Sequence, residues 1–239
     1  MQPKTQQTKL TAALFALCVA ALVWFAAAHA QTSAPAKDNV LLARKPLATL
    51  DCELVGGRIY VPVQVNGHAA RAVLDTGAGG SVMDLALADA WQLPMQGVVN
   101  ATGGGGSGVT GKMLNGVNAV LGGLAEPLPY ALPLGALAEK EGRPIEVIFG
   151  YHFFQTHLVE VDYARRQVRI FAAETEPEPG GTVLPLRIVA NKPHIAAELV
   201  VGGARYKLEA HLDTGASNSS LSAKFLRAQP LEVPTTPPF

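Results

Sequence analysis

Apolar and polar residues alternate along one stretch near residue 60, and this pattern predicts a β-strand. Four aliphatic residues occupy every second position: Ile59, Val61, Val63 and Val65. Such a period of two is typical of a strand with one buried face. Asn66-Gly67 follows, a dipeptide that favours a two-residue hairpin turn, and residues 68–74 then lead back toward Asp75. The pattern predicts an antiparallel hairpin that ends at an acidic residue.

Similar local signals predict the other elements. Residues 85–91 have the composition of a short helix, with Asp84 placed to cap it. Residues 157–171 predict a strand, a turn and a second strand, and residues 109–120 also favour a strand over a helix. Together these signals indicate an all-β protein with one or two short helices.

A repeat is the most informative feature of the chain. Residues 72–84 read AVLDTGAGGSVMD and residues 210–222 read AHLDTGASNSSLS, so that a shift of 138 residues superimposes the two without a gap. The shift places Ser222 on Asp84, which predicts a second helix cap. It predicts the same order in both copies: strand, D-T-G turn, strand and helix cap. Gly202-Gly203 supplies the turn of the second upstream hairpin.

The repeated D-T-G suits the chemistry of paired carboxylates. A glycine lets the chain fold tightly after the aspartate, so backbone N–H groups can hydrogen-bond the carboxylate. Two such turns brought face to face would hold two carboxylates that share one proton, because both cannot ionise cheaply at short range. The ionised member can then accept a proton from water while the protonated member donates to a substrate carbonyl.

These residues resemble the retropepsin-like aspartic proteases, in particular the secreted bacterial type with D-T-G-A motifs. The resemblance rests on four segments: residues 73–84, the glycine-rich TGGGGSG at 102–108, VIFG at 147–150, and residues 158–171. It implies an all-β fold with closed, barrel-like lobes and an aspartic endopeptidase that acts on peptide or protein substrates. No cofactor and no metal are implied.

The resemblance also assigns roles to individual residues. Asp75 and Asp213 would be the catalytic aspartates. The implied supporting residues are Thr76, Gly77, Thr214, Gly215 and Gly150, and the implied substrate flap contains Gly103, Gly104, Gly105 and Gly106. A second VIFG does not occur before Phe239, so the expected second lobe is incomplete. Two pairings stay open: Asp75 with Asp213 in one chain, or two first lobes joined as a homodimer through Asp75.

Composition shifts predict the domain boundaries. Lys4 and Lys9 precede an apolar run that ends in Ala-His-Ala at 28–30, the pattern of a signal peptide cleaved after Ala30. The predicted order is a signal peptide at 1–30, a flexible lead-in at 31–49, a protease lobe at 50–171, a linker at 172–182 and an incomplete second lobe at 183–239. This places the protein in the periplasm or outside the cell. An uncleaved leader would instead anchor it in the membrane.

Charge and cysteine content exclude several classes. Loss of residues 1–30 would leave a net charge of −2 with no basic stripe, which argues against a nucleic-acid partner. Cys52 would then be the only cysteine, which excludes an internal disulfide. A buried thiol is favoured over a nucleophile at this position.

Other site motifs fit this sequence less well. Residues 106–112 nearly match a phosphate-binding P-loop, and residues 103–108 match G-x-G-x-x-G, but both motifs need a helix to follow. His152 and His157 lack a third metal ligand at sensible spacing, and no serine lies in G-x-S-x-G. His211, two residues before Asp213, either tunes that carboxylate or is structural. The alternative function is a catalytically inactive retropepsin-like peptide-binding module of the cell envelope.

Overall fold

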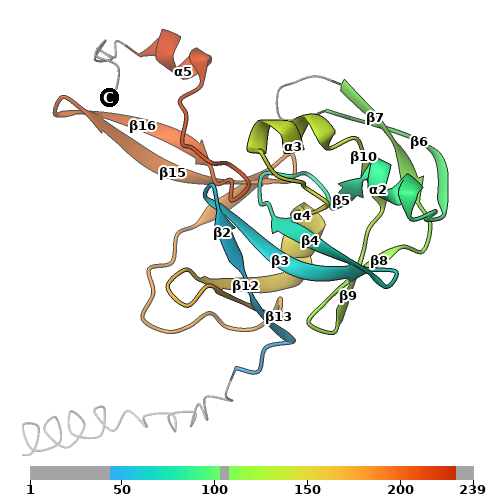
Figure 1. Cartoon of the computed structure of the whole chain (residues 1–239). Helices are drawn as coiled ribbons and strands as arrows, with labels where there is room; N and C mark the ends of the chain where they lie inside the picture. The colour runs from blue at the N-terminus through green and yellow to red at the C-terminus, as the bar shows by residue number, and fades with distance from the viewer. Residues whose placement is uncertain (1–43, 103–107, 230–239) are drawn as a thin grey trace, which may run out of the picture. The chain divides into compact units, whose positions relative to one another are not determined.

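The fold is built from β-strands with a few short helices, as a computed structural model of the chain shows for residues 44–102 and 108–229 (Figure 1). The prediction of an all-β fold is therefore confirmed. The strands are β1 (Ala48–Asp51), β2 (Glu53–Val55), β3 (Arg58–Val65), β4 (His68–Leu74), β5 (Val82–Asp84), β6 (Met95–Thr102), β7 (Gly108–Leu114), β8 (Asn118–Leu121), β9 (Leu124–Pro127), β10 (Tyr130–Leu132), β11 (Val147–Phe149), β12 (His157–Asp162), β13 (Gln167–Ala172), β14 (Leu186–Val189), β15 (Lys192–Val201) and β16 (Ala204–His211). The helices are α2 (Leu85–Ala90), α3 (Gly135–Glu141), α4 (Tyr151–Thr156) and α5 (Ala223–Ala228).

The strands form three sheets. Ten of them make one mixed sheet in the order β6-β7-β10-β5-β11-β4-β3-β8-β9, with β2 paired to β3. A three-stranded sheet has the order β1-β13-β12, and another has the order β14-β15-β16. Strands β12 and β13 are the predicted strand–turn–strand unit of residues 157–171, and their pairing runs from His157↔Ala172 to Asp162↔Gln167.

The hairpin predicted from the alternating pattern is present as β3 and β4. Asn66 and Gly67 have φ values of 46° and 88°, which is the left-handed turn geometry that this dipeptide favours. The four aliphatic residues at alternate positions are all buried: Ile59, Val61, Val63 and Val65. Tyr60 on the opposite face is also buried, because a second cluster of apolar side chains covers that face of the hairpin.

Strand β11 inserts between the two strands that flank the first D-T-G turn. It runs parallel to β4, with Phe149 opposite Leu74, and antiparallel to β5, with Val147 opposite Met83. The three residues of β11 are buried, and the Asp75 N–H donates to the Phe149 carbonyl at 2.9 Å. The apolar segment VIF thus holds the end of β4 from which the aspartate emerges.

Helix α2 begins where its cap was predicted. The Asp84 carboxylate accepts a hydrogen bond from the Leu87 N–H at 3.1 Å, and its other oxygen accepts from the Leu134 N–H at 3.0 Å. One carboxylate therefore caps α2 and also fixes the residue that precedes α3.

Phe149 and Phe153 stack at 4.8 Å between ring centroids and are two of the largest fully buried side chains in the core.

The second copy of the repeat has a different environment. Its hairpin, β15 and β16, turns at Gly202-Gly203 as predicted, and the Ser222 hydroxyl accepts from the Phe225 N–H to cap α5. The strand predicted after the second D-T-G turn is wrong, because residues 219–222 are not part of a strand. In the first copy that strand, β5, is held by β10 and β11, and no described residue plays those roles in the second copy. No residue between 172 and 229 is buried.

Several predictions concern residues outside the described ranges. The signal peptide at 1–30, most of the lead-in at 31–49 and the flap residues Gly103–Gly106 fall there. Strand β13 ends at Ala172 and β14 begins at Leu186, but the division into domains stays a prediction. Within residues 44–102 and 108–229, no helix is long and apolar enough to cross a membrane.

Candidate active site

The first D-T-G turn folds around its own carboxylate. Asp75 follows β4 directly, and its Oδ1 accepts hydrogen bonds from the Gly77 N–H at 2.8 Å and the Ala78 N–H at 3.1 Å. The Ala78 N–H also lies 3.2 Å from the Asp75 carbonyl oxygen, which closes the turn. The carboxylate is thus fixed by backbone donors rather than by a positively charged side chain.

The second turn repeats this arrangement with one donor fewer. The Asp213 Oδ1 accepts from the Gly215 N–H at 2.9 Å, and the Ala216 N–H donates to the Asp213 carbonyl at 3.3 Å. Two segments with the same sequence therefore adopt the same local turn. The turn survives in the second copy although the strand after it is missing, because its hydrogen bonds are local.

The two threonines join the turns. The Thr76 hydroxyl donates to the Leu212 carbonyl at 2.7 Å and accepts from the Thr214 N–H at 3.0 Å. The Thr214 hydroxyl donates to the Leu74 carbonyl at 2.7 Å and accepts from the Thr76 N–H at 3.1 Å. Each hydroxyl acts as both donor and acceptor across the pair. The four bonds lock the residues directly beside the two aspartates.

The two glycines bring the carboxylates close. A Cβ on Gly77 would lie 2.4 Å from Cγ of Asp213, and a Cβ on Gly215 would lie 2.3 Å from Cγ of Asp75. Each carboxyl group therefore occupies the space that a side chain on the opposite glycine would need. The structure thus brings Asp75 and Asp213 of one chain together, as in the first of the two predicted pairings.

The electrostatics of the pair follow from this geometry. Burial, and then the negative charge of Asp213, raise the pKa of Asp75 from 3.8 to about 6, although the Gly77 N–H acts in the opposite direction. Two carboxyl groups this close hold one proton between them over a range of pH. The site can therefore present one carboxylate and one carboxylic acid at the same time.

Gly150 supports the first turn from behind. Its N–H donates to the hydroxyl of buried Ser81 at 3.2 Å, and a Cβ at this position would lie 2.4 Å from the Gly80 carbonyl oxygen. The Tyr151 N–H donates to the Ala78 carbonyl at 2.9 Å. Sequence reasoning missed Ser81 as a supporting residue. The signal was available, because the repeat places Ser219 at the equivalent position.

The residues around the predicted flap form strands. Thr102 at the end of β6 pairs with Gly108 at the start of β7, so the segment that contains Gly103–Gly106 joins two antiparallel strands. Residues 108–114 are β7, not the helix that a P-loop or a dinucleotide-binding motif would need. Neither phosphate-binding interpretation fits this geometry.

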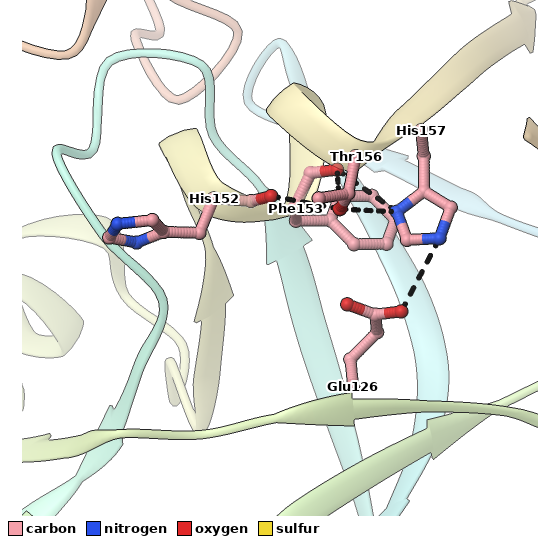
Figure 2. Close-up of polar contacts among 5 residues, drawn as sticks. All are labelled: Glu126, His152, Phe153, Thr156 and His157. Atoms are coloured by element: carbon pink, nitrogen blue, oxygen red, sulfur yellow. Dashed lines mark hydrogen bonds and ion pairs between the residues drawn. The ribbon is translucent and has the colours of Figure 1, made fainter. Parts of the chain in front are cut away.

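The two histidines after VIFG have separate surroundings. His157 lies 3.4 Å from Glu126 through Nε2 and contacts the Phe153 carbonyl through Nδ1, whereas the ring of His152 points away from both (Figure 2). Burial raises the pKa of Glu126, and the nearby His157 partly offsets this rise. Among residues 44–102 and 108–229, no group of three or more His, Cys, Asp or Glu residues is arranged to hold a metal ion.

The two remaining candidates are His211 and Cys52. The His211 ring stacks on His194 at 5.4 Å, and burial lowers its pKa despite the opposing effect of the Asp213 charge. Cys52 is buried, and burial raises the pKa of its thiol, which disfavours the nucleophilic thiolate.

Comparisons with known proteins found the following similarities. A family model described as "Aspartyl protease" matches residues 61–153. Among solved structures, the chain is similar to a retropepsin-like aspartic protease from Rickettsia conorii, with 15% sequence identity and a TM-score of 0.33. That match covers 52% of this chain and 90% of the other. No curated protein matches the chain.

Proposed function

We propose that this chain is a retropepsin-like aspartic endopeptidase with Asp75 and Asp213 as its catalytic pair, because its residues 61–153 match a family model described as "Aspartyl protease". The observation that carries the proposal is the reciprocal contact of the two D-T-G turns, in which each carboxyl group lies against the opposite glycine. Four threonine hydrogen bonds support this arrangement.

The proposed mechanism uses one water and one shared proton. The ionised aspartate accepts a proton from a water held between the two carboxyl groups, and the hydroxide equivalent attacks the peptide carbonyl carbon. The protonated aspartate donates to the carbonyl oxygen, so the tetrahedral intermediate forms without a metal or a covalent enzyme adduct. Collapse of the intermediate with proton transfer to the amine nitrogen breaks the C–N bond. Asp75 is suited to hold the shared proton, because its pKa is raised to about 6.

The test is cleavage of a mixed peptide library from about pH 3 to 7 by the purified protein. Asp75→Asn and Asp213→Asn should each abolish cleavage, since either change removes the acid–base pair. Asp89→Asn is the matched control, because Asp89 is an exposed aspartate of α2 and should be dispensable. Activity that survives Asp213→Asn but not Asp75→Asn would favour a homodimer of first lobes over the intrachain pair.

The same experiment separates catalysis from binding. A folded wild-type protein that binds peptides but cleaves none at any pH, with unchanged affinity after Asp75→Asn, would be a peptide-binding module of the cell envelope. We also propose that the protein acts in the periplasm or outside the cell after removal of residues 1–30. N-terminal sequencing of the native protein should then begin at Gln31, whereas a membrane-anchored form would retain the leader.

A further inference from the structure

Each D-T-G motif is preceded in the chain by a hairpin and, before that hairpin, by a tight turn. The two tight turns occupy equivalent places in the first half of the molecule, which contains Asp75, and in the second half, which contains Asp213. The turn between β2 and β3 consists of Gly56 and Gly57, and it is closed by the pair Val55↔Arg58. The turn between β14 and β15 consists of Ala190 and Asn191, and it is closed by Val189↔Lys192. All four turn residues have positive φ, from 49° to 80°. Gly57 and Asn191 are therefore the same position of the same type of turn.

Each turn rests on the loop that follows the opposite D-T-G motif. The Asn191 side-chain amide donates to the Gly79 carbonyl at 3.3 Å. In the other half, a Cβ on Gly57 would lie 3.6 Å from both Cα and the carbonyl oxygen of Ser217. Gly79 and Ser217 are separated by the 138 residues of the repeat. The loop residues of the two contacts are thus related by the repeat, but only the Asn191 side supplies a side-chain donor.

In the loop that follows the first D-T-G motif, three successive carbonyl groups have contacts that restrain them. The Ala78 carbonyl accepts from the Tyr151 N–H, and the Gly80 carbonyl packs against Gly150. Both restraints come from the loop's own half of the chain. Between them, the Gly79 carbonyl is bonded by Asn191 from the other half. The loop is therefore held on two sides by different halves of the molecule.

We propose that Asn191 is a positioning residue for the Asp75 turn. Its amide holds the Gly79 carbonyl and so keeps the preceding N–H groups of Gly77 and Ala78 directed at the Asp75 carboxylate. Asn suits the position for two reasons: it tolerates positive φ, and it carries the donor. The effect on catalysis rests on the proposed protease function, whereas the effect on the loop does not.

The experiment uses two substitutions that keep the turn and remove the donor. Asn191→Gly retains the positive φ, and Asn191→Asp retains the size but offers the Gly79 carbonyl only acceptors. Asn66 provides the matched control, because it has φ 46° in the β3–β4 turn and no described residue accepts a hydrogen bond from its side chain. Asn66→Gly and Asn66→Asp should therefore reproduce any general effect of changing a turn asparagine.

Two readouts are measured on the whole protein. Hydrogen exchange of the amides at residues 77–81 should accelerate about three- to tenfold in both Asn191 variants and stay unchanged in both Asn66 variants, as expected for the loss of one hydrogen bond. The kcat for a cleaved peptide should fall by a similar factor while KM stays within about twofold. A merely structural role would lower the melting temperature without changing kcat per folded molecule.

A substitution that adds the corresponding hydrogen bond to the loop after the second D-T-G motif tests the same proposal. Gly57→Asn introduces the missing amide next to the Ser217 carbonyl, at a φ of 80° that asparagine tolerates better than most residues. Slower amide exchange at residues 215–219 would support the proposal. Equal exchange at residues 77–81 in the Asn191 and Asn66 variants would overturn it. Faster exchange in the Asn191 variants of a protein that cleaves nothing would support the positioning role and refute the protease function.

Discussion

Replacing Thr214 by Val should measurably destabilise the protein, because it removes half of the hydrogen bonds that join the two D-T-G turns. The side chain keeps its shape, but the Leu74 carbonyl loses its donor and the Thr76 N–H loses its acceptor. A typical intramolecular hydrogen bond contributes about 0.5–1.5 kcal/mol, so the loss of two should lower the free energy of unfolding by about 1–3 kcal/mol.

The symmetry of the contacts makes the double variant informative. Thr76→Val removes the other two bonds and should cost a similar amount. Because the first loss already loosens the turns, the two changes together should cost less than their sum, with a coupling free energy of about 0.5 kcal/mol or more. Peptide cleavage should fall in each single variant, since both carboxyl groups depend on the same four bonds.

The assay is urea unfolding followed by circular dichroism, with two controls. Thr214→Ser keeps the hydroxyl and should stay close to wild type. Thr110→Val removes the exposed hydrogen bond from Thr110 to Asn100 and should change the free energy of unfolding by less than about 0.5 kcal/mol. If Thr214→Val were no more destabilising than Thr110→Val, the threonine contacts would not be what holds the turns together.

Three further predictions follow from single sites. The folded-state pKa of Asp75, about 6, lies above its ordinary value of 3.8, so the free energy of unfolding should fall as pH rises between these two values. Asp75→Asn should therefore raise the free energy of unfolding at pH 7 by up to about 3 kcal/mol and have little effect below pH 4. Urea titrations at several pH values measure both effects. Gly150→Ala should lower the melting temperature and abolish cleavage, because the new Cβ would lie 2.4 Å from the Gly80 carbonyl oxygen; wild-type activity would contradict that geometry. Cys52 should react with a thiol reagent only when urea unfolds the chain, and fast reaction in buffer would show that the thiol is accessible.

Much of the local structure could be predicted because its causes are local. Alternating apolar residues, the Asn66-Gly67 turn and the caps at Asp84 and Ser222 depend on neighbours within a few residues, and all four are present. The D-T-G turns are local in the same sense. Two copies in register also indicated that the turns pair, since each turn carries the same donors and acceptors for its partner.

The features that sequence reasoning missed depend on residues far apart in the chain. The strand predicted after Asp213 is absent because a strand needs partners, and the partners that hold β5 in the first half come from β10 and β11. Asn191 could not be singled out for a related reason. Its role comes from a contact with Gly79, which lies 112 residues away, and no local pattern marks such a contact.

The identity of the two D-T-G turns has a consequence for how the pair assembles. Each turn offers the other the same hydroxyl, N–H and carbonyl groups, so this chemistry alone cannot distinguish the turn of its own chain from the equivalent turn of another molecule. The turn of the same chain is favoured because the two turns are covalently connected. This connection gives the second turn an effective concentration of about millimolar or more around the first. A single nick between Ala172 and Leu186 would leave every contact chemically intact. It would, however, turn a concentration-independent association into one that is lost on dilution.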